Sequence, residues 1–427
     1  MSPMSLTQIG LRMSRLTGVR AIMKDIVETL QSGAAADWIN LSAGNPVLLP
    51  EVVEMWRGYT QQLAASPDFG EVVCRYGVTQ GYEPLIEAVV NWFNQHYGWG
   101  ITRRNILITP GSQSIYFYAA NAFGGRDPAG SLRSVVLPLS PDYTGYGSVM
   151  LTEDALVSYK PKLEMLGSHR FKYRPDFDQL QIDGSTGAVL FSRPCNPTGN
   201  VLTDQEVQQI LAMAEPHGIP VLIDSAYALP FPNLVFAPMQ PIWAENVIHC
   251  LSLSKAGLPG ERIGIAIGQE KYLKAMEAFQ ANASIHSSRF GQAIAAQAIA
   301  SGELARLSDQ VIKPHYLAKF ARLEAAVDRE LPADLPWYLH KAEGGLFAWL
   351  WLADLPISDW DLYQAIKTEK VVVVPGSSFF PGLEEDWPHK HQCIRISLTA
   401  TMEAIEQGIA AVGRVLSKVY GRVPLSV

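Results

Sequence analysis

Lys255 stands at the end of an apolar run, in the stretch CLSLSKAGLPGERIG (residues 250–264). Most lysines lie on solvated surfaces, which is the ordinary alternative. Partial burial at a strand end lowers the pKa of the amine, and a neutral amine can form a Schiff base with an aldehyde. Ser252 and Arg262 place a hydroxyl and a guanidinium on either side, a pair suited to a phosphate dianion. The stretch predicts a reactive amine beside a phosphate site.

A second phosphate cradle is predicted by TPGSQS (109–114). An apolar run leads to Gly111, where the backbone can approach a ligand closely. Ser112 and Gln113 then begin a helix whose first N–H groups are free to bind an anion. Many turns between a strand and a helix contain Gly and Ser, so the motif is weak alone. It lacks the full GxxxxGK[ST] pattern, and a nucleotide-binding P-loop is not supported.

Five further residues follow or interrupt apolar runs, and each has an ordinary and a functional interpretation: Asp224, Tyr227, Asn196, Tyr143 and Arg395. Asp224 is a helix N-cap or a buried carboxylate for a cationic ring nitrogen, with the phenol of Tyr227 on the same loop. Asn196 belongs to a turn or donates a hydrogen bond into a cleft, and Tyr143 packs in the core or stacks on a planar ligand. Arg395 lies within a strand pattern, where a guanidinium is costly unless a partner such as a substrate carboxylate pairs with it.

The segment HKHQC offers three metal-ligating side chains, those of His389, His391 and Cys393. No matching cluster of ligands occurs elsewhere in the chain. A structural role near the start of a strand is therefore favoured, and no metal is expected.

These side chains need elements that bring the ends of several apolar runs together. Continuous rather than alternating apolar runs are typical of strands buried on both faces, as in a mostly parallel sheet. In such sheets functional groups gather beyond the carboxyl ends of the strands. A helix is predicted over 203–218, where Thr203 and Glu206 form a capping box. The apolar runs are 105–111, 134–141, 187–194, 220–227, 247–255 and 263–268.

Beyond residue 270 the pattern changes to that of a smaller α+β region. The expected helices cover 271–282, 289–330 and 401–419, and the expected strands lie in GGLFAWLWL, VVVVPG and CIRISLT. The first 50 residues fit neither the large sheet nor a separate domain, and we expect them to pack with the C-terminal part. We therefore predict a large domain over 56–299 and a small domain built from 1–55 and 300–427.

The composition excludes several other classes of protein. The 427 residues are 48% hydrophobic, which suffices for a large core, and the net charge of −7 is spread without a basic block. Nucleic acid and membranes are therefore not expected partners. The N-terminus lacks a signal-peptide core, and the apolar runs are about half of the ~20 residues that a membrane span needs. Four scattered cysteines without a CxxC pair complete the prediction of a cytoplasmic protein.

A reactive lysine, a phosphate cradle, a stacking aromatic, a carboxylate for a ring nitrogen, a phenol and a carboxylate-binding arginine together describe a pyridoxal 5'-phosphate site. The sequence resembles the fold-type I, class I and II aminotransferases from end to end. The shared motifs occur in order: LSAGNP, RYGVTQGYEPL, TPGSQS, PDYTGY, NPTGN, DSAY, SLSKAGLPGERIG and IRISL. The resemblance implies an α/β fold whose large domain holds a mostly parallel seven-stranded sheet, beside a smaller α+β domain.

The resemblance also implies roles for single residues. Lys255 would bind the aldehyde carbon of the cofactor and move a proton between the substrate Cα and the cofactor C4′. Asp224 would pair with the pyridinium nitrogen. Tyr227 and Asn196 would hydrogen-bond the ring 3-hydroxyl oxygen, and Tyr143 would stack on the ring. The other cofactor-binding residues would be Gly111, Ser112, Gln113, Ser252 and Arg262, joined by Tyr76 from a neighbouring subunit.

The substrate site and the assembly follow from the same resemblance. Arg395 would clamp the α-carboxylate of the substrate, aided by Asn196 and the backbone of Gly44. A site completed by Tyr76 implies a homodimer with a shared active site. No second arginine is obvious for a side-chain carboxylate, and Arg289 is the alternative left open; an apolar amino donor is favoured.

One spacing departs from many relatives. They separate the Schiff-base lysine from the phosphate arginine by eight residues, whereas Lys255 and Arg262 are seven apart, as in some branches.

Further motifs resemble those of the aminotransferase branch that exchanges amino groups between valine and pyruvate: SRPCNPTGNV, SLSKAGLPG, FFPGL and WPHKHQC. The expected reaction is a ping-pong transfer from an apolar amino acid, valine first, to pyruvate, giving 3-methyl-2-oxobutanoate and alanine. Alternatives are another donor, such as alanine or an aromatic amino acid, or a pyridoxal-phosphate C–S β-lyase, which would release pyruvate and a thiol without an acceptor oxo acid. A non-enzymatic regulator fused to a DNA-binding helix-turn-helix is disfavoured, because the segment before NLSAGNP is short and not basic enough.

Overall fold

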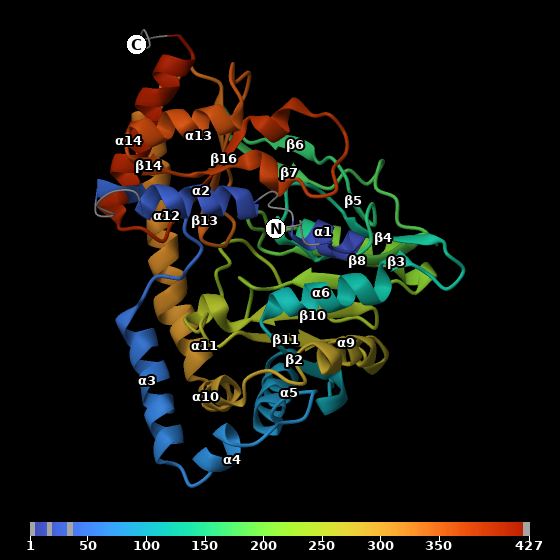
Figure 1. The fold of residues 1–427 in the computed structure, drawn as a ribbon. Helices are drawn as coiled ribbons and strands as arrows, with labels where there is room; N and C mark the ends of the chain where they lie inside the picture. Colours follow the sequence, from blue (N-terminus) through green and yellow to red (C-terminus); the bar gives the residue numbers. More distant parts are fainter. Residues whose placement is uncertain (1–4, 15–18, 32–36, 422–427) are drawn as a thin grey trace.

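The larger sheet has eight strands, and its centre is parallel. The computed structural model describes residues 5–14, 19–31 and 37–421 (Figure 1). Strands β4, β8, β9 and β10 run parallel, β5 pairs in parallel with β4, and β11 pairs antiparallel with β10 and β2. Along the sheet the strands are β2 (Ile106–Pro110), β11 (Ile263–Ile267), β10 (Val247–Ser252), β9 (Val221–Asp224), β8 (Thr186–Ser192), β4 (Leu132–Leu137) and β3 (Gly125–Arg126), with β5 (Leu156–Ser158) beside β4.

The mostly parallel sheet that the sequence predicts is confirmed, with one strand more than the seven expected. The addition to that count is β3, a two-residue strand that pairs antiparallel with β4. Every residue of β8, β9, β10 and β11 is buried, which explains why their sequences are continuously apolar.

Helices cover both faces of this sheet. On one face the core joins α6 (Ser112–Phe123), α7 (Gly145–Val149) and α9 (Glu270–Ala283). On the other it joins α5 (Glu83–Tyr97), α8 (Asp204–Ala214) and α10 (Arg289–Ala300). Helix α8 begins at the predicted capping box, in which the side chains of Thr203 and Glu206 each accept a hydrogen bond from the other's backbone N–H.

The helix-like stretch predicted over 289–330 is divided in the structure. Helix α10 ends before Gly302, which adopts a left-handed conformation (φ 76°) that glycine favours. The chain then forms α11 (Glu303–Leu307), a short π-helical turn, and the long α12 (Lys313–Glu330). The stretch is therefore helical, as predicted, but it is made of several helices.

A second, six-stranded sheet draws on two separated parts of the chain. Its strands, in order, are β15 (Val374–Pro375), β16 (Cys393–Ser397), β13 (Phe347–Leu352), β12 (Trp337–His340), β7 (Arg170–Arg174) and β6 (Lys162–Met165). Strand β7 pairs in parallel with β12, so the middle of the chain is hydrogen-bonded to the C-terminal part. The division into domains at 56–299 stays a prediction.

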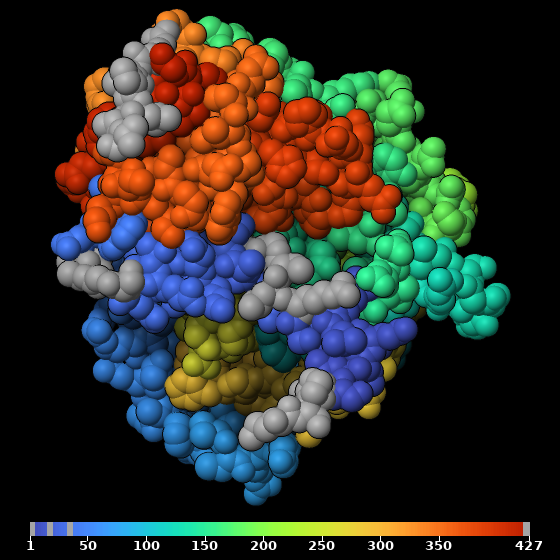
Figure 2. Space-filling model, turned by 45° about the horizontal axis from the view of Figure 1, so that its top comes forward, coloured from blue at the N-terminus to red at the C-terminus, as the bar shows by residue number. Residues whose placement is uncertain are grey.

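The N-terminal segment also lies against the C-terminal part. Strand β1 (Ile39–Asn40) pairs with β14 (Val371–Val372). Tyr363 and Lys367 donate hydrogen bonds of 2.7 and 2.9 Å to the Asp25 carboxylate. In the space-filling view the N-terminal residues (dark blue) touch the orange and red C-terminal part, and the surface is hollowed below them (Figure 2). The other helices are α1 (Gln8–Ser14), α2 (Val19–Gln31), α3 (Pro50–Ala65), α4 (Phe69–Val73), α13 (Asp359–Thr368) and α14 (Met402–Val419).

Two further observations concern the described part of the chain. None of its helices is both long and apolar enough to span a bilayer. The four cysteines are free: Cys74 is exposed, and Cys195, Cys250 and Cys393 are buried.

Candidate active site

One pocket lies beyond the carboxyl ends of the parallel strands. Nine of the twelve residues that line it were singled out from the sequence: Ser112, Gln113, Tyr143, Asn196, Asp224, Tyr227, Ser252, Lys255 and Arg262. They follow different strands, β2, β4, β8, β9 and β10, which converge at this edge of the sheet. Two surface hollows elsewhere are larger, about 780 Å³ each, but their linings bring no such set of groups together. The chemistry of the lining, not its volume, therefore marks this pocket as the candidate site.

Lys255 reaches the pocket from a short helical turn that follows β10. The turn covers Leu253–Ala256 and ends at Gly257 in a left-handed conformation (φ 88°). The Nζ atom of Lys255 donates a hydrogen bond of 2.7 Å to the carbonyl oxygen of Gly44. Burial, reinforced by the charges of Arg395 and Arg262, lowers the pKa of the Lys255 amine to about 8. The amine is therefore available in its neutral, nucleophilic form near neutral pH.

Asp224 is a buried carboxylate at the end of β9. Its Oδ2 accepts a hydrogen bond of 2.8 Å from the Tyr146 hydroxyl, and its Oδ1 accepts one of 2.9 Å from the Ala226 N–H. Burial raises the pKa of Asp224, and its hydrogen-bond donors and the Lys255 charge partly oppose that shift. A buried carboxylate of this kind is stabilised by a cationic group placed opposite it, such as a protonated ring nitrogen.

The other end of the pocket is rich in donors for an anion. Ser112 and Gln113 begin helix α6, whose first N–H groups lack partners within the helix. Gly111 has φ 84°, and a Cβ atom at this position would collide with the Arg262 guanidinium. Arg262 Nη1 donates to Ser254 Oγ at 3.1 Å, and its own φ of 53° is rare for a residue with a side chain. The seven-residue spacing from Lys255 thus still brings the guanidinium beside Gly111.

Arg395 adjoins the pocket from β16 and is buried. It donates hydrogen bonds of 3.0 Å to Asn196 Oδ1 and 2.9 Å to the Ser42 carbonyl. Its Nε has no hydrogen-bond partner among the described residues, and its guanidinium lies 3.9 Å from the centroid of the Phe347 ring. Burial lowers the pKa of Arg395 to about 10. A buried guanidinium with a free donor is suited to bind a carboxylate.

Three lining residues were not singled out from the sequence as site residues: Tyr116, Ala226 and Ser254. Tyr146, which donates to Asp224, was also missed, although it lies in the PDYTGY motif three residues after Tyr143. Its ring is 5.2 Å from that of Tyr116. Helix packing brings these phenols to Asp224, and no spacing in the sequence indicates it.

Gly44, Gly111 and Arg395 adjoin the lining residues, whereas Tyr76 and Arg289 lie away from the pocket of this chain. Tyr76 is 84% exposed on the surface, with its ring 6.0 Å from that of His286. Arg289 donates a hydrogen bond of 2.8 Å to the Glu71 carbonyl oxygen and is not among the lining residues. The role of Tyr76 therefore depends on a second copy of the chain.

The HKHQC segment is used for packing. His389 is buried and stacked on Trp387, with ring centroids 4.3 Å apart, and its Nε2 is 2.5 Å from the Tyr173 hydroxyl. Cys393 Sγ donates to the His389 carbonyl, whereas His391 lies near Asp359. Among the described residues no three His, Cys, Asp or Glu side chains are arranged to hold a metal ion.

Comparisons with known proteins agree on one family. The profile "Aminotransferase class I and II" matches residues 36–412. The valine–pyruvate aminotransferase of Escherichia coli (strain K12) is 38% identical over 417 residues, covering 98% of this chain and 99% of that protein. A putative amino-acid aminotransferase from Psychrobacter arcticum 273-4 has a TM-score of 0.93 at 36% identity, covering 98% of this chain and 100% of that one. The valine-pyruvate aminotransferase AvtA from Salmonella typhimurium LT2 has a TM-score of 0.85 at 37% identity, covering 93% and 99%.

Proposed function

The chain belongs to the class I and II aminotransferases, with their fold-type I architecture, and from this premise we propose that it transfers an amino group from valine to pyruvate. The products would be 3-methyl-2-oxobutanoate and alanine, formed in two half-reactions at one site. The observation that carries the proposal is the position of Lys255, a partly buried amine between an anion cradle and a buried carboxylate. The specificity rests on full-length similarity to a valine–pyruvate aminotransferase.

The groups that line the pocket fit pyridoxal 5'-phosphate. The N-terminus of α6, Ser252 and Arg262 offer donors for a phosphate, and a side chain in place of Gly111 would fill part of that cradle. Asp224 supplies the carboxylate that a ring nitrogen requires. When bound, this cofactor withdraws electrons from the carbon that bears the amino group and carries that group from donor to acceptor.

Each of the remaining roles belongs to a residue of this chain. Lys255 Nζ would hold the cofactor at its aldehyde carbon and would move the proton at the substrate Cα. Asp224, oriented by Tyr146, would keep a proton on the ring nitrogen. Tyr227 and Asn196 would donate hydrogen bonds to the ring hydroxyl oxygen, and Tyr143 would pack on the face of the ring. These groups are preorganised, since the side chains of Asp224, Tyr146, Tyr227 and Asn196 are buried.

The substrate would be held by its α-carboxylate. Arg395 has an unpaired Nε and accepts this role together with Asn196, while the Gly44 segment lies next to the Lys255 amine. Among the lining residues the one arginine is Arg262, which faces Gly111. Because Arg395 is assigned to the α-carboxylate, neither arginine of the site is left for a side-chain carboxylate, which favours an apolar amino donor.

The active enzyme would be a homodimer that shares its two sites. Tyr76 would complete the phosphate site of the partner subunit. It belongs to a set of exposed apolar residues along and near 69–78, namely Phe69, Val73, Tyr76, Val78 and Ile285. The hydrogen bond from the Gly77 N–H to His286 brings the two parts of this set together. Exposed apolar residues that gather in one region are typical of a protein interface.

The decisive experiment offers single amino acids and 2-oxo acids to the pyridoxal-phosphate-loaded protein. Valine alone should change the visible absorption of the bound cofactor, and pyruvate should restore it with release of alanine. A protein whose spectrum responds to neither valine nor alanine does not have the proposed specificity. Release of pyruvate and a thiol from a cysteine conjugate without any acceptor would instead indicate a lyase.

A further inference from the structure

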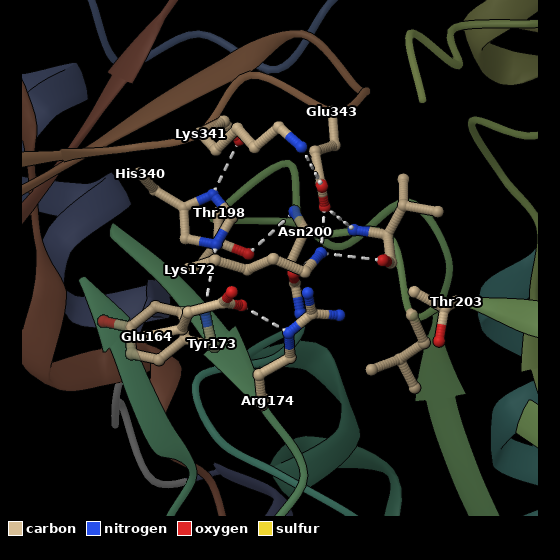
Figure 3. Close-up of polar contacts among 12 residues, drawn as sticks. Glu164, Lys172, Tyr173, Arg174, Thr198, Asn200, Thr203, His340, Lys341 and Glu343 are labelled. Carbon is tan, nitrogen blue, oxygen red and sulfur yellow. Dashed lines mark hydrogen bonds and ion pairs between the residues drawn. The ribbon is translucent and has the colours of Figure 1, made fainter. Parts of the chain in front are cut away.

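A buried ion pair lies outside the pocket and joins two parts of the molecule (Figure 3). Lys172 on β7 and Glu343, between β12 and β13, are in direct contact through Nζ and Oε2. Their side chains are 2% and 5% exposed, so both charges are removed from water. Burial alone would raise the pKa of Glu343, but the Lys172 charge and the hydrogen bonds it accepts hold that pKa below its ordinary value. The carboxylate is therefore ionised at neutral pH.

Lys341 Nζ lies 3.2 Å from Glu343 Oε1, and the other partners that satisfy this pair belong to the loop that carries Asn196. Lys172 Nζ donates hydrogen bonds of 2.9 Å to Asn200 Oδ1 and to the Val201 carbonyl oxygen. Glu343 Oε2 accepts one of 3.0 Å from the Val201 N–H. Buried ion pairs need such additional hydrogen bonds to offset the cost of desolvation. The pair and the segment 200–201 are thus fixed to each other.

The loop transmits this restraint to Asn196. The Cys195 N–H donates to the Asn200 carbonyl at 2.9 Å, and the Gly199 N–H donates to the Cys195 carbonyl at 2.8 Å, which closes 195–200 into one compact turn. Gly199 packs so closely on the segment after Glu343 that a Cβ atom there would lie 2.6 Å from the Gly344 carbonyl oxygen. A displacement of residues 200–201 therefore displaces the whole turn.

We propose that Lys172 and Glu343 are positioning residues for Asn196. The pair holds the 195–201 turn, which follows a strand of the eight-stranded sheet, against the six-stranded sheet. Arg395 belongs to that second sheet, and its guanidinium donates to Asn196 Oδ1 at 3.0 Å. The pair thus sets the distance between Asn196, which is assigned to the ring hydroxyl oxygen, and Arg395, which is assigned to the substrate carboxylate. This inference rests on the proposed function, in which Asn196 serves both groups.

The first test is Glu343→Gln, a substitution of nearly equal size, in the cofactor-loaded protein. The pH midpoint of the cofactor's visible band should move toward that of Asn196→Ala, because the hydrogen bond to the ring oxygen is misplaced. We expect kcat/KM to fall about 10- to 100-fold. Hydrogen exchange at the Val201 amide should accelerate in the same variant.

A double-mutant cycle shows whether the effect passes through Asn196. In the Asn196→Ala background, Glu343→Gln should shift the midpoint by much less than it does in the wild-type protein. An equal shift in both backgrounds would overturn the inference.

A second variant separates positioning from stability. Lys172→Met/Glu343→Leu removes both charges and leaves no unpaired buried charge, so its melting temperature should be close to that of the wild type. The spectral midpoint should stay displaced, because the bonds to residues 200–201 are lost. A midpoint that recovers together with the melting temperature would show a merely structural role. This variant decides the question if Glu343→Gln does not fold.

The matched control is Asp328→Asn, which removes one partner from the partly exposed ion pair of Arg170, two residues before Lys172 on the same strand. It should leave the midpoint in place. Failure of the proposed function is distinguishable: a wild-type protein without a visible cofactor band, or one whose band is unchanged by Asn196→Ala, lacks the assumed site. A normal response to Asn196→Ala with none to Glu343→Gln refutes the positioning role alone.

Discussion

The molecule buries two lysines close to its active site, and the surroundings of the two amines are opposite. Lys255 has the Gly44 carbonyl as its hydrogen-bond acceptor, and two guanidinium groups help burial to lower its pKa to about 8. Burial also lowers the pKa of Lys172, but the Glu343 carboxylate in contact with it acts in the other direction. Burial beside two guanidinium groups thus produces a reactive amine at Lys255, whereas a carboxylate in direct contact produces a structural ammonium at Lys172.

The largest expected effect tests the reactive side of this comparison. Lys255→Ala should lower the rate of amino transfer by at least about 10⁴-fold, because no other amine is found among the described residues that line the pocket. Its melting temperature should not fall, since the substitution removes a poorly solvated cation. Single-turnover absorbance and thermal unfolding measure the two quantities. Turnover near the wild-type rate would refute the assignment of Lys255.

For Lys172, in contrast, we expect a substitution to lower the stability of the fold. Lys172→Met leaves the buried Glu343 carboxylate with only the half-exposed Lys341, whose Nζ is 3.2 Å from Oε1, as a cation, which should cost up to about 3–5 kcal/mol of folding free energy. Urea unfolding measures it. The control is Lys162→Met on the neighbouring strand β6, whose lysine pairs with Asp176 and Asp178 at the surface and should cost no more than about 1 kcal/mol. Equal losses in the two variants would contradict a special role for the buried pair.

The two lysines also differ in how well their positions can be predicted from the sequence. Lys255 follows an apolar strand and precedes glycines and an arginine, so its position at the carboxyl edge of a parallel sheet can be predicted. Asp224, Ser112 and Arg262 are predictable for the same reason. Lys172 stands in RFKYR, a segment with the pattern of a half-exposed strand. Its partner is 171 residues away, and the pairing of β7 with β12 that joins them leaves no local signal.

The same limit explains what else was missed. Tyr146 contacts Asp224 from helix α7, 78 residues earlier in the chain. The left-handed Gly302 divides the helix-like stretch 289–330, and apolar periodicity does not mark that turn. Residues placed by a strand end are predictable, and residues placed by contact between distant elements are not.

A pH dependence sharpens the contrast at Lys255. Its pKa is about 8 in the folded protein against 10.5 as the ordinary value, so between these two pH values the unfolded chain binds the additional proton. The stability of the cofactor-free protein should therefore rise from pH 8 to about pH 10 by a contribution on the order of 2 kcal/mol. Lys255→Met should abolish this contribution and leave those of all other groups. Urea unfolding at several pH values, with the two proteins compared at each, measures the difference; parallel curves would show that the amine is not perturbed.

The smallest effect concerns the buried anion that faces the reactive lysine. Lys172 is stabilised by a carboxylate in contact with it. The Asp224 carboxylate, in contrast, accepts hydrogen bonds from neutral donors, the Tyr146 hydroxyl and the Ala226 N–H. Tyr146→Phe removes one of these donors and should raise the pKa of Asp224 further, since the Tyr146 hydrogen bond lowers it. Pyridoxal 5'-phosphate should then bind about tenfold more weakly, a loss of roughly 1.4 kcal/mol for one hydrogen bond to a charged group. Tyr272→Phe is the matched control, because it removes a hydroxyl from the same cluster of buried residues at a distance from the site. Equilibrium dialysis of the cofactor measures both variants, and equal affinities would show that Asp224 does not depend on Tyr146 for its charge.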